Sequence, residues 1–161
     1  RYDLPLSVRL TPHQSAAPDL VDTVLRTLAD VSLPAASLCL AMPAREIFDG
    51  RPQSLDNLTA LAKAGVRTAV HDFTGNPSEV VRLPDLPLRT VSLSSRLIAQ
   101  ARAMSGRALM TKAVANLTAL VHEAGATISV DDLRTEPEVE WWRSAGADTA
   151  SGPLFPIQGQ P

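Results

Sequence analysis

The 161-residue chain has the size and composition of one globular domain, with 45% apolar and 20% charged residues. Its formal net charge is −2, so we expect no binding to a nucleic acid polymer, which requires a broad positive field. No stretch approaches the roughly eighteen apolar residues that span a bilayer, so we expect no membrane insertion. The single cysteine, Cys39, lies in an apolar run, which predicts a buried thiol and a reducing, cytoplasmic location.

Short apolar runs alternate along the chain with segments of helical period. The runs that we interpret as strands are 5–11, 37–42, 67–73, 89–95, 126–132 and 149–155. The first helix is predicted over 18–31, where apolar residues recur every three or four positions. This alternation predicts an α/β fold with about six parallel strands covered by helices. A spacing of about 25 to 30 residues per unit fits either a doubly wound sheet or a (β/α) barrel.

Glycines and a capping pattern mark the expected helix ends. Gly65, Gly125 and Gly146 each follow an alanine where a helical pattern stops, and they suit the left-handed position that closes a helix. Thr135 and Glu138 have the spacing of a capping box, which predicts a helix start.

Two later helices are expected to bury one apolar face each. The predicted faces are Leu55, Leu58, Leu61 and Ala62 in the first, and Leu109, Ala113, Leu117, Leu120 and Val121 in the second. The segment 95–115 is longer than a simple crossover, so we expect an extra helix there with a break at Gly106. Residues 157–161 are predicted to form a loose tail.

Polar side chains stand where the predicted strands end, which is where parallel α/β folds place working residues. They are Arg9, Thr11, Ser92, Ser94, His71, Asp72, Asp131, Asp132 and Ser151. This is a poor set for Mg²⁺, which needs several carboxylate ligands. His71 and Asp72 could hold a transition metal only weakly. Each also has a structural interpretation: His71 as a hydrogen-bonded group inside the sheet, and Asp72 as a helix cap or a partner of Arg9. Asp131 and Asp132 could simply solvate a loop.

The order of these segments resembles the EAL domain, the family of cyclic di-GMP phosphodiesterases and their inactive relatives. VRLT is similar to the family's VNLS strand, LCLAMPA to LEITE, and HDFTGN to DDFGTG. VDDLRT stands where AEGVET belongs, and SGPLF where QGYLF belongs. The resemblance implies a modified TIM barrel over residues 1–156 that lacks the first barrel strand and helix. Active members of this family linearise cyclic di-GMP with Mg²⁺ or Mn²⁺.

The chain departs from the family at the positions that the resemblance assigns to metal ligands and their neighbours. Residues at these vestigial positions are Arg9, Ala41, Ala44, His71, Ser92, Ser94, Asp131, Arg134 and Ser151, and of the family's aspartate pair only Asp72 remains. Losing these carboxylates removes the charge that holds two cations. We therefore expect a degenerate domain that has no resident metal or other cofactor and no phosphodiesterase activity.

Two functions remain open, and retained or altered catalysis is a third, less favoured one. The favoured function is a regulatory module that contacts a protein partner or forms a homodimer. Its candidate surfaces are the segment after Ser95 and whichever of Trp141 and Trp142 is exposed. The alternative is a metal-free cyclic di-GMP receptor, with Arg9 at a phosphate and Asp72, Asp131 or Asp132 as further contacts. We also expect 5–11 to form an open sheet edge, covered by a second copy or a neighbouring domain.

Overall fold

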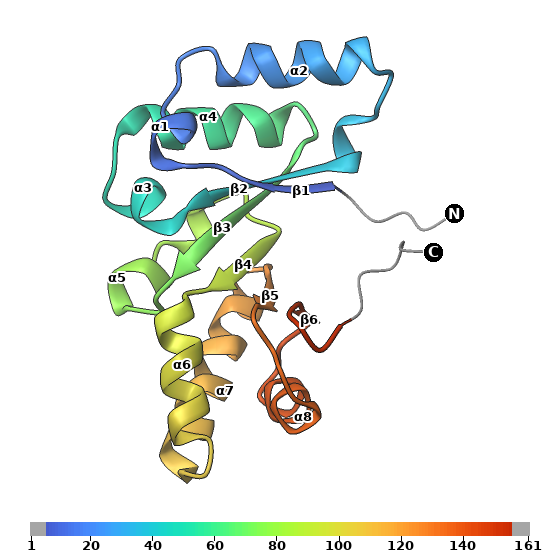
Figure 1. Ribbon diagram of the computed structural model, residues 1–161. Coiled ribbons are helices and arrows are strands. Elements are labelled where there is room, and N and C mark those ends of the chain that lie inside the picture. Colours follow the sequence, from blue (N-terminus) through green and yellow to red (C-terminus); the bar gives the residue numbers. More distant parts are fainter. Residues whose placement is uncertain (1–5, 156–161) are drawn as a thin grey trace, which may run out of the picture.

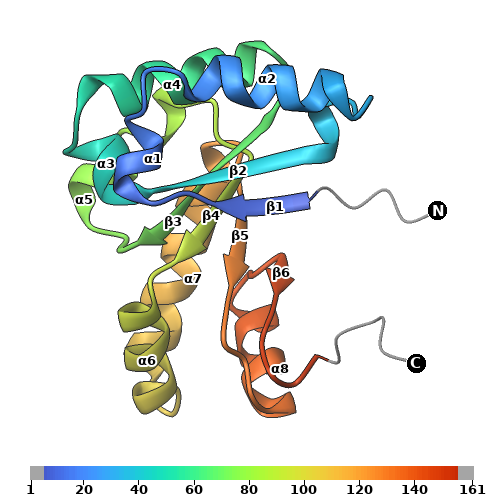
Figure 2. The ribbon, with the colours of Figure 1, turned by 45° about the horizontal axis from the view of Figure 1, so that its top comes forward.

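Six parallel strands lie in one sheet in the order in which they occur in the chain. They are β1 (Leu6–Arg9), β2 (Leu38–Pro43), β3 (Arg67–Phe73), β4 (Thr90–Leu93), β5 (Thr127–Val130) and β6 (Thr149–Ala150). The computed structural model describes residues 6–155, and in it the sheet curls into a half-barrel with helices on its outside (Figures 1 and 2). The predicted fold of about six parallel strands is confirmed. The tail predicted at 157–161 lies outside the described residues.

Helices connect consecutive strands on the outer face of the sheet. They are α1 (Pro12–Ser15), α2 (Leu20–Asp30), α3 (Ala44–Phe48), α4 (Pro52–Lys63), α5 (Pro77–Val80), α6 (Ser95–Met104), α7 (Ala108–Glu123) and α8 (Glu136–Ser144), with short 3₁₀ turns at Ala35–Ser37 and Leu83–Asp85. Helix α2 occupies the range predicted for the first helix. The extra helix after Ser95 and the break at Gly106 are also confirmed, because α6 ends at Met104 and α7 begins at Ala108.

The expected helix ends are present at the predicted residues. Gly65, Gly125 and Gly146 have φ of 87°, 82° and 97°, the left-handed conformation that a glycine adopts without steric cost. The Thr135 side chain accepts a hydrogen bond from the Glu138 backbone, and the Glu138 carboxylate accepts one from the Thr135 backbone. Both halves of the capping box therefore form.

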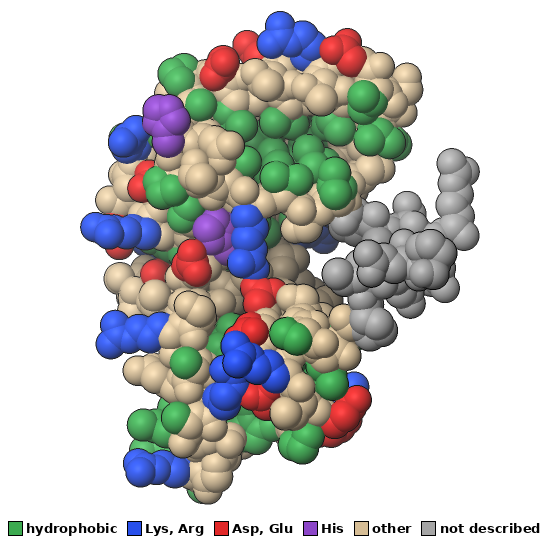
Figure 3. All heavy atoms as spheres, in the orientation of Figure 1, with side chains coloured by type: hydrophobic (Ala, Val, Ile, Leu, Met, Phe, Trp, Pro, Cys, Tyr) green, Lys and Arg blue, Asp and Glu red, His purple; other side chains and the backbone are tan. Residues whose placement is uncertain are grey.

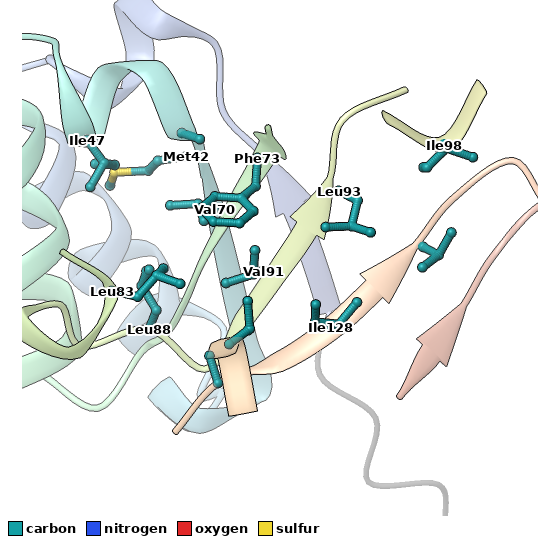
Figure 4. Packing of buried hydrophobic residues seen from close by; sticks show 14 of the residues in the cluster. Met42, Ile47, Val70, Phe73, Leu83, Leu88, Val91, Leu93, Ile98 and Ile128 are labelled. Atoms are coloured by element: carbon teal, nitrogen blue, oxygen red, sulfur yellow. The ribbon is translucent and has the colours of Figure 1, made fainter. Parts of the chain in front are cut away.

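The apolar core lies between the outer face of the sheet and the helices. Met42, Val70, Phe73 and Val91 point from β2, β3 and β4 into this layer (Figure 4), and all four are fully buried. Burying one side chain of this size stabilises the fold by roughly 1.5–3 kcal/mol. Cys39 is also buried, at 8% exposure, and burial raises the pKa of its thiol despite the hydrogen bond with Ser7.

The apolar face predicted for α7 is partly wrong. Leu109 is 80% exposed and Leu120 is 45% exposed, whereas Val114, Thr118 and Val121 are buried. The Thr118 hydroxyl also donates to the Ala145 carbonyl in the turn after α8. Helix α7 carries two overlapping apolar stripes, and its contacts with that turn and with β5 decide which one is buried. The helical period of the sequence alone therefore does not predict which of the two stripes is buried.

The inner face of the half-barrel carries small and polar side chains. Neighbouring strands are in register, so residues at paired positions share this face. They include Ser7, Arg9, Cys39, Ala41, Ala69, His71, Thr90, Ser92, Thr127, Ser129 and Thr149. Bulky branched residues usually fill the interior of a closed (β/α) barrel. This inner face is instead lined by short side chains: Cys39, Ala41 and Ala69 form a small buried apolar cluster, and polar residues flank it.

Strands β1 and β6 are the two ends of the described sheet (Figure 2). All four residues of β1 are exposed, including Leu6 at 64% and Val8 at 38%. The predicted open edge at 5–11 is thus present among the described residues. None of the helices in residues 6–155 is long and apolar enough to cross a membrane.

Candidate functional site

The carboxyl ends of the strands meet at one rim of the half-barrel, which we call the mouth. On the face shown in Figure 3, basic, acidic and histidine side chains gather at the waist of the molecule, between the upper and lower groups of helices. Because all six strands are parallel, each polar residue predicted at a strand end is delivered to this rim.

Arg9, Asp131 and Ser151 form one connected group across the mouth. The Arg9 guanidinium donates to Oδ2 of Asp131. The Ser151 hydroxyl donates to Oδ1 of the same carboxylate at 2.7 Å. Both oxygens of Asp131 therefore have partners. The predicted alternative in which Arg9 pairs with Asp72 is wrong, because the curl of the sheet brings Arg9 to Asp131 instead.

His71 and Asp72 lie in an irregularity of β3, where the register with β4 shifts between Val70 and Phe73. Asp72 has a φ of 59°, which aspartate tolerates better than most residues, and its side chain is 66% exposed. His71 Nδ1 lies 2.9 Å from Oδ2 of Asp72, and Nε2 lies 3.1 Å from the Leu10 carbonyl oxygen. Both imidazole nitrogens therefore lie within hydrogen-bond distance of protein oxygens, which agrees with the interpretation of His71 as a hydrogen-bonded group inside the sheet.

Three residues at positions that the resemblance assigns to the family site bring no charged group to the mouth. Ala41 and Ser92 are buried on the inner face of the sheet, at 4% and 8% exposure. The Ser94 hydroxyl accepts a hydrogen bond from the Leu97 backbone at 3.2 Å and so caps α6. The cap of α5 is Asn76, whose side chain accepts from the Glu79 backbone, so the prediction that Asp72 caps this helix is wrong.

A network of charges joins the loop after β5 to α6 and α8. Arg134 donates to Asp132 at 2.9 Å, and Arg102 donates to the Asp132 carbonyl at 2.9 Å and to the Glu138 carboxylate. The hydrogen bond from Arg134 lowers the pKa of Asp132, outweighing the opposite effect of burial. Burial opposes ionisation of Glu138, but hydrogen bonds from the Arg134 backbone and from Arg102 outweigh it and lower the pKa. Both carboxylates are thus stabilised in their ionised form.

A cavity of about 450 Å³ opens in the mouth, and the four residues predicted to bind a ligand in the receptor interpretation all line it. They are Arg9, Asp72, Asp131 and Asp132. Two arginines of α6 that sequence reasoning missed, Arg96 and Arg102, complete the charged lining. Ser95, Ala99 and Arg102, which follow one another at spacings of four and three, lie on one face of α6 and line this cavity. This spacing was the feature of the sequence that could have indicated that α6 contributes to the site.

A larger cavity of about 890 Å³ lies beside the first, and Asp72 and Arg96 line both. Its other charged lining residues are Arg45, Glu46 and Asp49 from α3 and the turn after it. These two cavities together place arginines and carboxylates along the mouth. That mixture suits a ligand that carries both anionic groups and hydrogen-bond donors.

Glu79 fastens the loop that follows β3, and sequence reasoning missed this residue too. It is 4% exposed, and its Oε2 accepts from the Thr74 backbone at 2.9 Å, the Thr74 hydroxyl at 2.8 Å and the Gly75 backbone at 3.0 Å. A buried carboxylate needs such donors, and in return the loop beside Asp72 is held in one conformation.

The side chains in the mouth do not fit a pair of divalent cations. Ala41 has no ligand atom, Arg9 adds a fixed positive charge, and both oxygens of Asp131 already accept hydrogen bonds. Across residues 6–155, no three His, Cys, Asp or Glu side chains converge at a spacing that could hold a metal ion.

Sequence comparisons relate the whole described chain to one family. Residues 1–157 match the family model of the EAL domain. A protein of Azorhizobium caulinodans is 23% identical over 93% of the chain, which spans 20% of that protein. The cyclic di-GMP phosphodiesterase RocR of Pseudomonas aeruginosa is 21% identical over 93% of the chain, which spans 38% of RocR.

Solved structures share the fold. The phosphodiesterase PaMucR in complex with c-di-GMP superposes with a TM-score of 0.85 at 24% identity, covering 97% of this chain and 68% of PaMucR. The Xanthomonas citri FimX EAL domain, also in complex with c-di-GMP, gives 0.84 at 17% identity, covering 98% of this chain and 63% of that one. The chain belongs to the EAL domain family, the family of cyclic di-GMP phosphodiesterases.

Proposed function

We propose that this domain is a non-hydrolytic signalling module of the EAL family that binds cyclic di-GMP without a metal. One observation carries the proposal: Arg9, Asp72, Asp131 and Asp132 line a single cavity at the carboxyl ends of the strands. Two structural relatives are complexes with c-di-GMP, which makes this dinucleotide the first ligand to test.

The charges around the cavity suit both parts of a cyclic guanine dinucleotide. Arg9, Arg96 and Arg102 offer guanidinium groups, which bind phosphate oxygens through charge-assisted hydrogen bonds. Asp72 offers an exposed carboxylate, which can accept from the N–H groups of a guanine edge, whereas Asp131 and Asp132 can accept only through lone pairs that Arg9, Ser151 and Arg134 do not use. Three positive and three negative groups balance, so the site selects a ligand that has donors as well as phosphates.

The same residues argue against hydrolysis. The family reaction uses cations to activate water and to neutralise charge that develops on the phosphodiester. Arg9 can neutralise phosphate charge, but a guanidinium does not generate hydroxide from water at neutral pH. Ser92 stands where the resemblance places a lysine, and its neutral hydroxyl does not replace that positive charge.

Isothermal titration calorimetry in EDTA tests this function, with ATP as a control for nonspecific binding to arginines. We expect micromolar binding of cyclic di-GMP, one ligand per domain, and little heat with ATP. Absence of heat at high cyclic di-GMP concentration would reject the receptor function.

A protein-contact module is the second candidate, and it was the favoured one from sequence. The exposed apolar side chains Met104 (38%) and Leu109 (80%), on either side of the break at Gly106, support it. Trp141 is half-buried, whereas Trp142 is only 3% exposed, as expected for one buried and one accessible tryptophan. The exposed β1 edge also offers a surface for a homodimer, which light scattering at several concentrations tests.

A further inference from the structure

Both tryptophans of the chain lie on α8, beside a cavity of about 380 Å³. The rings of Trp141 and Trp142 are 4.9 Å apart in a T-shaped arrangement. The Trp141 indole donates to the Thr111 hydroxyl of α7 at 3.3 Å. Because the chain has no other tryptophan, its tryptophan fluorescence reports on α8 alone.

Among residues 6–155, Arg102 alone lines both this tryptophan cavity and the mouth cavity of about 450 Å³. Its side chain is 34% exposed. The Nε–H donates to the Glu138 carboxylate, and Nη2 donates to the Asp132 carbonyl oxygen at 2.9 Å. A guanidinium has five N–H donors, so three of them are not used in these two hydrogen bonds, although the guanidinium also lies 3.7 Å from the Asp132 carboxylate.

Glu138 links the Arg102 side chain to the first turn of α8. One of its oxygens accepts from Arg102, and the other accepts from the backbone of Arg134 at 2.8 Å and of Thr135 at 3.3 Å. Trp141 and Trp142 follow three and four positions later, on the next turn of the same helix. A displacement of the Arg102 side chain therefore changes the contacts that fix the start of the helix carrying both tryptophans.

We propose that Arg102 is a positioning residue that couples an anion bound in the mouth to the first turn of α8 and its tryptophan pair. The identity of the ligand rests on the proposed function; the coupling itself requires only a phosphate in the mouth. Such a phosphate attracts the guanidinium through its free N–H groups and competes with Glu138 for it. The domain thereby transmits ligand occupancy from the mouth to the α8 surface.

The test is a titration of tryptophan emission on the intact protein, with cyclic di-GMP and pyrophosphate as separate probes and with calorimetry in parallel. The diagnostic variant is Glu138→Gln. Glutamine keeps the capping box, because its amide oxygen still accepts from the backbone, but it removes the charge that holds Arg102. Glu138 does not line the mouth cavity, but the ligand competes with it for Arg102, so we expect this variant to bind the ligand at least as tightly as the unchanged protein and to lose most of the emission change.

Arg143→Gln is the matched control, because Arg143 also lies on α8 and pairs with Glu140, yet it does not line the mouth. This variant should keep the full emission response. An equal response in Glu138→Gln and the unchanged protein, at matched saturation, overturns the coupling. No emission change with either probe overturns it as well. Absence of heat with cyclic di-GMP, together with a pyrophosphate response that Glu138→Gln abolishes, rejects the receptor function and leaves the coupling supported.

Discussion

Arg9 and Asp131 lie 122 residues apart in the chain and are joined by an ion pair across the mouth of the half-barrel. Arg9 ends β1 and Asp131 follows β5, four strands away in the order of the sheet. In a flat sheet, four strand spacings would separate them by about 19 Å. The ion pair therefore depends on the curl of the sheet, and it occupies the region where the resemblance places metal ligands.

The Arg9–Asp131 pair should contribute little to stability. Their side chains are 52% and 27% exposed, and exposed ion pairs are worth about 0–1 kcal/mol. Urea unfolding of Arg9→Gln, Asp131→Asn and the double variant gives the interaction free energy as a double-mutant cycle. A coupling of several kcal/mol would contradict an exposed pair and would point to a role in closing the sheet.

Replacing Arg96 by glutamine should weaken cyclic di-GMP binding with little effect on folding. Arg96 lines both cavities of the mouth, and among the described residues it forms no ion pair. A hydrogen bond to a charged group is worth about 1.5–3 kcal/mol, so the dissociation constant should rise roughly tenfold or more.

Arg26→Gln serves as the control for that measurement, since Arg26 is exposed on α2 and lines neither cavity of the mouth. Calorimetry in EDTA compares the two variants. Equal affinities for both variants would place the ligand away from the mouth.

Glu79→Ala should destabilise the protein by about 2–4 kcal/mol. The change removes a buried acceptor and leaves the Thr74 and Gly75 backbone N–H groups without their partner. Ser78→Ala is a suitable control, because the Ser78 hydroxyl makes only an exposed hydrogen bond to Asn76. Urea unfolding measures both, and hydrogen exchange should show faster opening of Thr74 and Gly75 in Glu79→Ala. Equal stability of the two variants would show that Glu79 does not fasten the loop.

The network around Asp132 and Glu138 should make stability fall in acid. Both carboxyl groups have pKa values below their ordinary values in the folded protein. A depressed folded-state pKa contributes stability above the unfolded-state pKa, and this contribution is lost as the pH falls through the folded-state value. The contribution should therefore be complete near neutral pH and disappear below about pH 4.

Unfolding free energies measured from neutral pH down to acid check this. Asp132→Asn combined with Glu138→Gln should give a flatter acid dependence than the unchanged protein. Parallel curves for the two proteins would mean that these carboxylates titrate alike in the folded and unfolded states.

Much of the fold follows from local patterns in the sequence. The alternation of apolar runs and helical periods predicts parallel strands covered by helices, but it leaves the strand order open between a doubly wound sheet and a (β/α) barrel. Gly65, Gly125 and Gly146 mark helix ends because few other residues adopt their backbone conformation. The convergence of strand-end residues at one rim follows from the same parallel arrangement.

The pairings inside the mouth depend on geometry that local patterns do not contain. The partner of Arg9 is Asp131 because of the curvature of the whole sheet, so the expected pairing with Asp72 fails. Arg96 and Arg102 line the mouth because α6 begins directly after β4 and lies beside the mouth. The helical period of the α6 sequence does not specify the direction of that helix. Glu79 is buried by a loop that folds back on it, although glutamate is usually exposed.

The most direct measurement is incubation of the purified protein with cyclic di-GMP and either Mn²⁺ or Mg²⁺, followed by chromatographic separation of the cyclic and linear dinucleotides. Because Arg9 and Ala41 stand where the resemblance implies metal ligands and Asp131 is already paired, we predict no linear product above a control without protein. Steady accumulation of the linear dinucleotide that stops on addition of EDTA would contradict the account.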